Sequence, residues 1–455
     1  MSLEYHHLDK WAFANLDLVE EALESNKKPA VLISGASSSG KSYSAAFLEK
    51  FLAKNGHRAI TISLDQYNVG LSHIIPNKVR DNYFDGHIEH LSEIEEIIKK
   101  IIYDVPFDKK YDQNVLKDIR KAVESYFSKE DLDKFINALY AEWKVLNFDE
   151  PTVYDLKEAA EDVKILLSGG SIQTKKYSKV VSERVPSDET VSGNDYDVIL
   201  IEGIYALDPT LVDALRDVYT IKDFIDGNPK SLFLRRIIRD AMTTSADNVF
   251  TISIYFQYIV KSYYESIYPC RMNADVILNN DMTFTEMKSG NLYTTKQELH
   301  TYSKEKFDKI LSQCQILDEI YQKDVYFSCE DEKNKNDNIL RFRLISEDGK
   351  HYTPSSLVHK GIPKVRRDDK IIRPINVLLN EKQLIKVWDN ENDCLDDFLR
   401  AGFRIGPVRF KKKILVIYHN RRLTLREVKD DGYYVEFTQE PNEETLKEIK
   451  ELFND

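Results

Sequence analysis

Eight residues, Gly35 to Ser42, have the types and spacing of a loop that binds phosphate. They read Gly-Ala-Ser-Ser-Ser-Gly-Lys-Ser, which fits glycine, four free positions, glycine, lysine and then serine or threonine. The glycines let the backbone turn tightly, so that successive N–H groups line a concavity for anionic oxygens. We expect Lys41 to supply a positive charge for the β- and γ-phosphates and Ser42 a hydroxyl for Mg²⁺. The expected phosphate-binding residues are Gly35, Ala36, Ser37, Ser38, Ser39, Gly40, Lys41, Ser42 and Tyr43.

The residues on either side favour a nucleotide site over a flexible linker. Residues 30–34 form an apolar run with the length of a buried strand, and residues 43–54 repeat apolar side chains at helical spacing. Strand, loop and helix in this order is the context that the motif requires. We therefore predict that this loop binds the phosphates of a nucleotide.

Carboxylates stand at the carboxyl ends of two further predicted strands. Residues 58–64 run into Asp65, and residues 197–201 run into Glu202. Ligands of doubly wound sheets bind at this edge. We expect Asp65 to accept the proton of an attacking hydroxyl or to organise Mg²⁺, and Glu202 to hold the metal through water. A helix N-cap is the alternative for Asp65.

Three arginines lie on a predicted helix that follows the fourth strand. Arg235 and Arg239 share one face at four-residue spacing, and Arg236 and Arg239 are close at three-residue spacing. Arginines on a mobile helix suit the negative charge that develops on a transferred phosphoryl group. We take Arg236 and Arg239 as catalytic candidates, with a solvated charge run as the alternative.

The net charge of −12 over 455 residues argues against a broad nucleic-acid-binding surface. The first residues lack the basic and apolar regions of a signal peptide, and no apolar run approaches the roughly 20 residues of a membrane span. The four cysteines are widely spaced and form no metal-like pair, which favours reduced thiols. We expect a cytoplasmic protein without a membrane or nucleic-acid partner; its oligomeric state, a homo-oligomer included, stays open.

The order of elements predicts two domains of different class. Residues 1–28 read as one amphipathic helix, and residues 29–285 alternate strands with helices, which implies an α/β fold with a parallel sheet covered on both faces. A run of charged amphipathic helices, about 73–146, interrupts the alternation as an insertion that could serve as a lid, a dimer surface or packing. Residues 286–455 read as strands with Asp-Gly turns and few helices, which marks an α+β domain. The expected parallel strands are residues 30–34, 58–64, 197–201, 219–225 and 274–279.

Taken together and in this order, the motifs of residues 30–280 resemble the uridine kinase and phosphoribulokinase family of P-loop kinases. The elements that carry the resemblance, besides the loop, are Ser63-Leu64-Asp65-Gln66-Tyr67, Asn147-Phe148-Asp149-Glu150-Pro151, Tyr177 through Arg184, Glu202-Gly203-Ile204, Arg235 to Asp240, and Ala274 to Ile277.

The resemblance implies roles for these elements. ATP would be the phosphate donor and Mg²⁺ the cofactor. Asp65 would activate the acceptor hydroxyl, Asp149 would hold the ribose hydroxyls of a nucleoside, and Tyr177 would contact its base. Arg184, at the end of the same segment, would also contact the substrate. The arginines of residues 235–240 would lie in a lid over the phosphates.

The acceptor side departs from the family. Nucleoside kinases carry an aromatic residue and a histidine after the tyrosine, where this chain has Lys179 and Ser182. The Arg-Gly that follows the lid motif is replaced by Thr243-Thr244-Ser245-Ala246. We expect intact phosphate chemistry and a small-molecule acceptor with a hydroxyl, a nucleoside or a related compound, with a pyrimidine nucleoside disfavoured.

Basic residues alternate along strands of the C-terminal half. Arg341 and Arg343 point to one side of a strand, and Lys411 and Lys413 do so on another. Cations from several strands that face the same side would converge inside a closed sheet and attract a polyanion such as triphosphate; a solvated sheet face is the alternative. The candidate anion-binding residues are Lys296, Arg341, Arg343, Lys360, Arg373, Lys411 and Lys413.

Residues from about 290 to 455 resemble the CYTH, or triphosphate tunnel, superfamily, which implies an antiparallel β-barrel. The elements concerned are Asp324-Val325-Tyr326-Phe327, Leu340-Arg341-Phe342-Arg343, Lys360-Gly361 and Tyr434-Val435-Glu436. Of the opening Glu-x-Glu-x-Lys only Lys296 remains, the second closing glutamate is Thr438, and Arg426 stands where an aspartate is usual. Because these carboxylates bind metal ions in the superfamily, we expect anion binding with weak or absent hydrolysis.

Three functions remain open at this point. The leading hypothesis is an ATP- and Mg²⁺-dependent P-loop phosphotransferase, uridine-kinase-like, that transfers the γ-phosphoryl group in line to an acceptor hydroxyl. The second is a hydrolase of pyrophosphate or triphosphate that acts through the C-terminal domain. The third is a non-catalytic nucleotide sensor.

Overall fold

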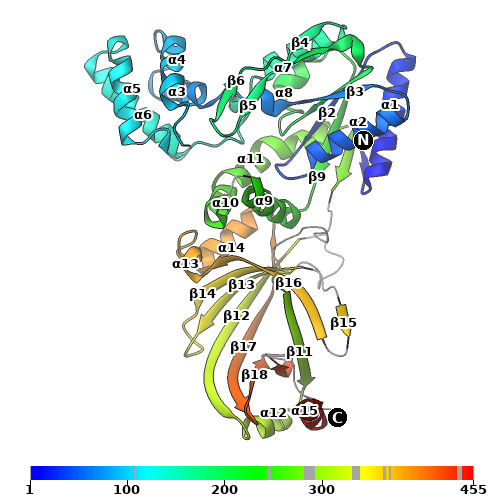
Figure 1. Ribbon diagram of the computed structural model, residues 1–455, viewed down its shortest axis with the longest axis vertical. Helices are drawn as coiled ribbons and strands as arrows, with labels where there is room; N and C mark the ends of the chain where they lie inside the picture. Colours follow the sequence, from blue (N-terminus) through cyan, green and yellow to red (C-terminus); the bar gives the residue numbers. More distant parts are fainter. Residues whose placement is uncertain are drawn as a thin grey trace. The chain divides into compact units, whose positions relative to one another are not determined.

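The computed structural model describes residues 2–106, 109–243, 247–280, 293–329, 339–361, 365–367, 370–437 and 443–453 (Figure 1). For residues 242–243, 293–297, 365–367, 370–374 and 443–444 it describes the backbone only. The chain divides by contacts into two compact units. Unit 1 comprises Met1–Gly227 and Lys261–Asn280, and unit 2 comprises Asn228–Val260 and Asp281–Asp455.

Unit 1 is built on a six-stranded parallel sheet in the order β1-β10-β9-β2-β8-β3. Its strands are β1 (Leu3–Tyr5), β2 (Ala30–Gly35), β3 (Ala59–Ser63), β8 (Val198–Glu202), β9 (Thr220–Asp226) and β10 (Val276–Asn279). The five parallel strands expected from the sequence are therefore confirmed. The predicted α/β fold with a parallel sheet is also confirmed.

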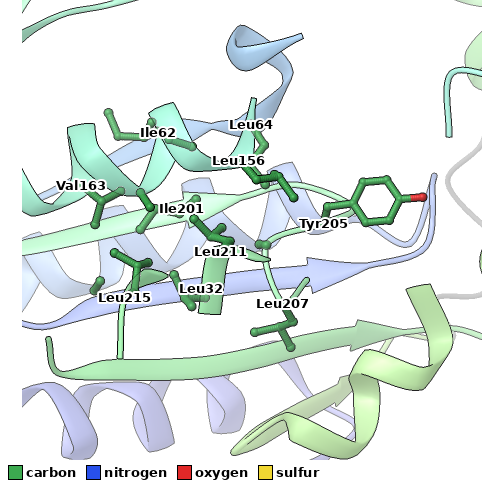
Figure 2. Packing of buried hydrophobic residues seen from close by; sticks show 14 of the residues in the cluster. Leu32, Ile62, Leu64, Leu156, Val163, Ile201, Tyr205, Leu207, Leu211 and Leu215 are labelled. Atoms are coloured by element: carbon green, nitrogen blue, oxygen red, sulfur yellow. The ribbon is translucent and has the colours of Figure 1, made fainter. Parts of the chain in front are cut away.

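Helices cover both faces of this sheet because its strands turn apolar side chains to both faces. On one face Val31 and Ile33 of β2 pack with helices α1 (Leu8–Glu24) and α2 (Lys41–Lys54). On the other face Leu32 packs with α7 (Leu156–Leu167) and α8 (Pro209–Ala214), as Figure 2 shows. Every residue of β2 is buried, which accounts for its continuous apolar sequence.

The strand order reverses between β2 and β8. The connection that leaves β2 runs through α2 to β3, past β8, whereas the connection that leaves β8 runs through α8 to β9, past β2. Such a reversal opens a crevice at the carboxyl ends of the two strands, where ligands of doubly wound sheets bind. The loop at residues 35–42 and Glu202 both lie at this point.

The N-terminal residues differ from the single helix that the sequence predicts. Leu3–Tyr5 form β1, which pairs in parallel with Val276 to Leu278 of β10, and the helix α1 begins only at Leu8. The strand forms because β10 would otherwise present unpaired backbone N–H and C=O groups at the edge of the sheet.

The region predicted to be a helical insertion contains helices with a core of their own. The described residues hold four helices there, α3 (Leu71–Tyr83), α4 (Leu91–Ile102), α5 (Gln113–Val123) and α6 (Lys129–Lys144). Ile94, Ile98, Ile119 and Phe135 are among the side chains that bury one another between them. The remaining elements of unit 1 are β4 (Ser171–Gln173), β5 (Lys176–Ser178), β6 (Glu183–Val185), β7 (Thr190–Ser192), and the short turns η1 (Leu64–Tyr67), η3 (Glu124–Tyr126), η4 (Pro151–Val153), η5 (Gly193–Asp195), η7 (Tyr263–Ile267) and η8 (Tyr268–Asn273).

Unit 2 contains an antiparallel sheet in the order β11-β19-β18-β17-β12-β13-β14-β16-β15, in which β11 also pairs with β16. The predicted antiparallel structure is thus confirmed, while the likeness to a CYTH barrel stays a prediction. The strands are β11 (Tyr293–Thr301), β12 (Gln315–Ser328), β13 (Ile339–Ser346), β14 (Thr353–Lys360), β15 (Val365–Arg367), β16 (Lys370–Asn380), β17 (Arg404–Tyr418), β18 (Arg421–Val428) and β19 (Gly432–Phe437).

The helices of unit 2 include a segment that the sequence assigned to the first domain. Residues 228–260, which we call the lid segment, hold α9 (Pro229–Thr243), α10 (Asn248–Ile254) and the π-turn η6 (Tyr255–Ile259), and they group with unit 2. The short helix α11 (Val260–Ser262) leads back into unit 1. The other helices are α12 (Lys304–Leu311), α13 (Glu381–Leu384), α14 (Glu391–Arg400) and α15 (Glu443–Phe453). Among the described residues no helix is both long and apolar enough to cross a membrane.

Candidate nucleotide and acceptor site

The loop after β2 has the backbone geometry that its glycines predict. Gly35 has a φ of 145° and Gly40 a φ of 101°, both in the region that favours glycine. A Cβ atom at Gly35 would meet the carbonyl oxygen of Ile225, and one at Gly40 would meet the side chain of Asn280. Helix α2 begins directly after Gly40, so the loop opens onto a helix N-terminus that favours anions.

Lys41, Ser42 and Glu202 come together at this loop. The Lys41 ammonium is buried and donates to the carbonyl oxygen of Ala36 at 2.8 Å. The Ser42 hydroxyl donates to Glu202 Oε2 at 3.1 Å, and the Ser63 hydroxyl donates to Glu202 Oε1 at 2.7 Å. Both oxygens of the Glu202 carboxylate are therefore oriented by serines.

Ser63 is a site residue that the motifs did not single out. It is the last residue of β3 and lies directly opposite Glu202 in the parallel pairing of β3 with β8. The position of Ser63 at the end of a predicted strand is the sequence feature that could have identified it as a site residue. Hydroxyl and carboxylate oxygens are the ligands that Mg²⁺ prefers, and Ser42 with Glu202 fits such an ion.

Asp65 lies in the first turn after β3, within η1, and its side chain is exposed. Its backbone N–H donates to the Ser63 hydroxyl at 3.3 Å, so this serine connects Asp65 to Glu202. The Lys179 ammonium lies 3.5 Å from Asp65 Oδ2. The residue that departs from the nucleoside kinases therefore stands beside the candidate base.

Asp149 and two tyrosines lie on the same side of the sheet. The backbone N–H of Asp149 donates to Asn147 at 2.9 Å, and the Tyr205 hydroxyl donates to the carbonyl oxygen of Asp149 at 2.5 Å. Burial raises the pKa of Tyr154 well above its ordinary value, and the charges of Asp65 and Asp149 raise it further. Tyr154 is thus a neutral phenol near both candidate substrate carboxylates, a role that the sequence did not indicate.

Tyr177 belongs to the short hairpin β5–β6. Burial raises its pKa. Ser182, which stands where the nucleoside kinases carry histidine, lies in the turn between the two strands, and its hydroxyl donates to the carbonyl oxygen of Lys179 at 3.4 Å. The residue opposite Tyr177 in the hairpin is Arg184.

Arg184 binds protein groups on every arm of its guanidinium. Nη1 donates to Glu158 at 2.8 Å, Nη2 to the carbonyl oxygen of Tyr67 at 3.2 Å, and Nε to that of Asn68 at 3.4 Å. It therefore holds the turn η1, which carries Asp65. This arrangement favours an indirect role over the substrate contact that the sequence predicts.

Arg236 and Arg239 lie on α9 in unit 2. Arg236 Nε donates to Asp240 Oδ2 at 2.6 Å, and Arg239 Nη2 donates to Asp240 Oδ1 at 2.9 Å. Arg236 is half-buried, Arg239 is exposed and Asp240 is buried. One buried carboxylate thus orients both arginines.

Three of the predicted anion-binding residues meet around a fully buried carboxylate in unit 2. Asp324 of β12 accepts from Arg343 Nε at 2.6 Å and from Lys411 Nζ at 2.6 Å, and Arg341 Nη1 lies 3.7 Å away. We call these four residues the charged face. Three cations surround one anion, so the group carries a net positive charge.

The pKa values of the charged face follow from its burial. Burial would raise the pKa of Asp324, but the hydrogen bond from Arg343 and the charges of Arg341, Arg343 and Lys411 outweigh it, so this pKa is lowered. Burial lowers the pKa of Lys411 to about 8, against the opposing effect of Asp324. Asp324 was quoted only as part of a motif, and its central position follows from the packing of three strands.

Of the other predicted anion-binding residues, two have described side chains and two do not. Lys413 follows Lys411 by two residues on β17, and Lys360 lies opposite Ile339, two residues before Arg341, so both share the side of the charged face. Lys296 and Arg373 lie on β11 and β16, with side chains outside the described residues.

Arg426 occupies the place between two carboxylates. Its Nη2 lies 2.9 Å from Glu298 Oε2, and its Nε lies 3.4 Å from Glu436 Oε2. One guanidinium thus forms ion pairs with both carboxylates. In the described part of the chain no group of three or more His, Cys, Asp or Glu side chains is arranged to hold a metal ion.

The parallel sheet, its P-loop and the carboxylates at the reversal of strand order define unit 1 as an α/β fold of the P-loop kinase kind. Residues 107–284 match the Phosphoribulokinase / Uridine kinase family. This range contains Asp149, Tyr177, Arg184 and Glu202, whereas the P-loop precedes it and is identified by its own motif and geometry.

Curated relatives agree with this match over part of the chain. A uridine kinase of Staphylococcus haemolyticus is 29% identical over 132 residues, which are 29% of this chain and 61% of that protein. A uridine kinase of Lactobacillus johnsonii is 27% identical over 155 residues, which are 34% of this chain and 69% of that protein. A solved structure described as a possible uridine kinase from Bacillus stearothermophilus is 15% identical with a TM-score of 0.29, covering 58% of this chain and all of that one. The match thus spans less than two thirds of the first relative.

Proposed function

We propose that this chain is an ATP- and Mg²⁺-dependent kinase that transfers the γ-phosphoryl group of ATP to a hydroxyl of a nucleoside or a related small molecule. The observation that carries the proposal is the grouping of Lys41, Ser42 and Glu202 at the reversal of strand order, with Asp65 at the end of the neighbouring strand. Phosphoryl transfer needs this set: a cation for the phosphates, oxygen ligands for the metal and a base for the hydroxyl.

The candidate site residues would divide the chemistry among them. Mg²⁺, held by Ser42 and through water by Glu202, would neutralise charge on the β- and γ-phosphate oxygens. Lys41 would turn from the carbonyl of Ala36 to the same oxygens. Asp65 would take the proton of the acceptor hydroxyl, and Lys179 would hold the Asp65 carboxylate in place. Arg236 and Arg239 would stabilise the transferred group.

A screen for ADP release tests this function. Nucleosides, sugars and phosphosugars are offered with ATP and Mg²⁺ to the full chain, to Lys41→Ala, to Asp65→Asn and to the control Lys54→Ala, which alters an exposed lysine in the last turn of α2. We expect Lys41→Ala to abolish turnover and Asp65→Asn to lower kcat by about 10²- to 10⁴-fold, the range of general base catalysis. Lys54→Ala should match the wild type.

Two outcomes of this screen would refute the proposal in different ways. Wild-type turnover in Asp65→Asn would exclude this residue as the base. ATP binding without turnover for any acceptor would favour a nucleotide sensor over a kinase.

A specific observation also favours a binding function for unit 2. The net positive charge around Asp324 supports the binding of a polyanion, with inorganic tripolyphosphate as the probe. The pairing of Arg426 with Glu298 and Glu436 argues against hydrolysis, because a guanidinium lies where these carboxylates would hold a metal ion. Calorimetry should show that Arg341→Gln weakens tripolyphosphate binding while Arg421→Gln, which alternation puts on the other side of β18, does not. Release of orthophosphate would instead support the hydrolase.

A further inference from the structure

The lid segment is unusual because the sequence places it inside the kinase unit while its packing belongs to unit 2. Strand β9 ends at Asp226, and the chain returns to unit 1 at Lys261 to complete the parallel sheet with β10. Between these points several apolar side chains, from Phe233 to Val260, are buried in one cluster with Val325 to Phe403 of unit 2. The candidate lid arginines are therefore carried by a segment whose core is completed by Val325 to Phe403, much further along the chain.

Aromatic rings make the main contact. Phe233 of α9 lies 5.5 Å from Phe398 of α14 between ring centroids, and Phe256 of η6 lies 4.9 Å from the same ring. Phe256 also lies 5.8 Å from Trp388, and Phe398 stacks on Phe327 of β12 at 4.0 Å. Phe233 and Phe398 are fully buried. One ring, Phe398, thus joins both parts of the lid segment to the antiparallel sheet.

Two strands of the sheet take part through alternate side chains. Phe327 of β12 and Leu340, Phe342 and Leu344 of β13 belong to the apolar cluster with the lid segment. The residues between them on β13 point to the charged face. The lid segment therefore packs on the apolar side of strands whose other side carries the charged face.

Polar side chains also lie at the contact of the segment with the sheet. Asn248, the first residue of α10, donates to the carbonyl oxygen of Leu378 at 2.8 Å. Lys230, in the first turn of α9, is buried near His359 of β14, whose pKa falls to about 4 through burial and the charge of this lysine. The hydrogen bond from Asn248 thus holds the segment to the sheet in addition to the rings, and the first turn of α9 lies near β14.

This packing also sets the rotation of α9 about its own axis. Phe233, Leu234 and Ile237 are buried on the side of the apolar cluster. Arg236 and Arg239 lie between and beyond them in the helical sequence and are held by Asp240. A change in how the three apolar residues seat would turn or shift the arginines with them.

We propose that unit 2 positions the lid, with Phe398 and Trp388 as positioning residues that act through Phe233 and Phe256 on Arg236 and Arg239. The inference rests on the proposed kinase function and on the role of these two arginines in it. A displacement of a catalytic group by about 1 Å is enough to cost up to about 100-fold in rate.

The test compares Phe398→Leu with Phe307→Leu in the full chain. Phe307 is buried in a separate apolar cluster of unit 2, with Ile310 and Leu425, so its replacement removes the same atoms from the same unit away from the lid segment. Both variants are assayed with the acceptor found in the screen, and kcat is expressed per molecule that binds ATP. Hydrogen exchange is followed over residues 229–243 and over the P-loop in the same samples.

We expect Phe398→Leu to lower kcat by about 10- to 100-fold with the KM for ATP unchanged, and to speed exchange in residues 229–243 but not in the P-loop. Phe307→Leu should keep the wild-type kcat. Asn248→Ala, which removes one hydrogen bond at the edge of the same contact, should give a smaller fall in kcat and serves if Phe398→Leu does not fold.

Equal kcat values in Phe398→Leu, Asn248→Ala and the wild type would overturn the inference and leave the kinase intact. A rise in the KM for ATP without a fall in kcat would also overturn the inference, since a general loosening of the fold would have this effect. Absence of turnover in the wild type would refute the kinase itself; unchanged exchange of residues 229–243 in Phe398→Leu would then refute the positioning contact as well.

Discussion

The substitution Asp324→Asn removes the charge at the centre of the charged face while keeping the volume of the side chain. In the wild type this carboxylate accepts from Arg343 at 2.6 and 2.8 Å and from Lys411 at 2.6 Å, with Arg341 at 3.7 Å. It is fully buried. An asparagine would leave the buried Arg341 and Lys411 and the partly buried Arg343 without a counter-charge and would turn an N–H group toward at least one of them.

The expected loss of stability is large. Breaking a buried ion pair by removal of one partner costs about 3–5 kcal/mol, and the upper end applies here because three cations share the carboxylate. A polyanion on the charged face should restore part of this loss, about 2.7 kcal/mol at a concentration of 100 times its Kd.

The stability of the wild type should show a matching pH dependence. Because the pKa of Asp324 is lowered on folding, its contribution is complete above the unfolded value of about 3.9 and is lost as the pH falls below it.

The assay is urea unfolding of the full chain at pH 7 and low salt, read by hydrogen exchange in β12 and β13, with and without sodium tripolyphosphate. Asp308→Asn, at an exposed position on α12, is the matched control and should change stability by less than about 0.5 kcal/mol. Tripolyphosphate should stabilise Asp324→Asn more than the wild type. The reasoning fails if Asp324→Asn is as stable as the wild type, or if tripolyphosphate does not restore its stability.

Three further predictions concern unit 1. Burial raises the pKa of Asp223 to about 8, so the folded wild type keeps a proton that the unfolded chain releases near pH 3.9. The free energy of unfolding of the wild type should therefore fall by about 1.4 kcal/mol per pH unit between these two values. Urea unfolding of Asp223→Asn should not show this slope. Glu202→Gln should raise the Mg²⁺ concentration for half-maximal turnover at least about tenfold, since it removes a charge from the metal site; an unchanged Mg²⁺ dependence would contradict its role. Gly40→Ala should weaken ATP binding by about tenfold or more in calorimetry, because φ at this position is 101° and the methyl group would meet Asn280, and unaltered affinity would exclude the strained loop as the reason for glycine.

The parts of the fold that depend on neighbours in sequence could be predicted. The P-loop needs eight consecutive residues at the junction of a buried strand and a helix. Strand β2 ends at Gly35 and helix α2 begins at Lys41, as this pattern requires. Asp65 and Glu202 were found because a parallel sheet brings the ends of its strands to one edge, whatever the details of packing. The antiparallel class of unit 2 followed in the same way from alternation and turns.

Other features depend on residues that are distant in sequence. Leu3–Tyr5 form a strand because β10, more than 270 residues later, offers a free edge. Ser63 reaches Glu202 because β3 pairs with β8 in that register, and the serine's own neighbours give no sign of it. Arg426 lies between Glu298 and Glu436 because β11, from a distant part of the chain, pairs with β19 of the β18–β19 hairpin.

The sequence by itself determined the phosphate loop, the carboxylates at the strand ends and the alternation of cations, since each is a local pattern of spacing. Only the tertiary structure decided that the lid segment belongs to unit 2. Phe233 and Phe256 read as ordinary core positions of a helix, and nothing in their spacing tells which core will bury them. That choice follows from the apolar side chains of β12, β13 and α14, which the folded chain alone brings to them.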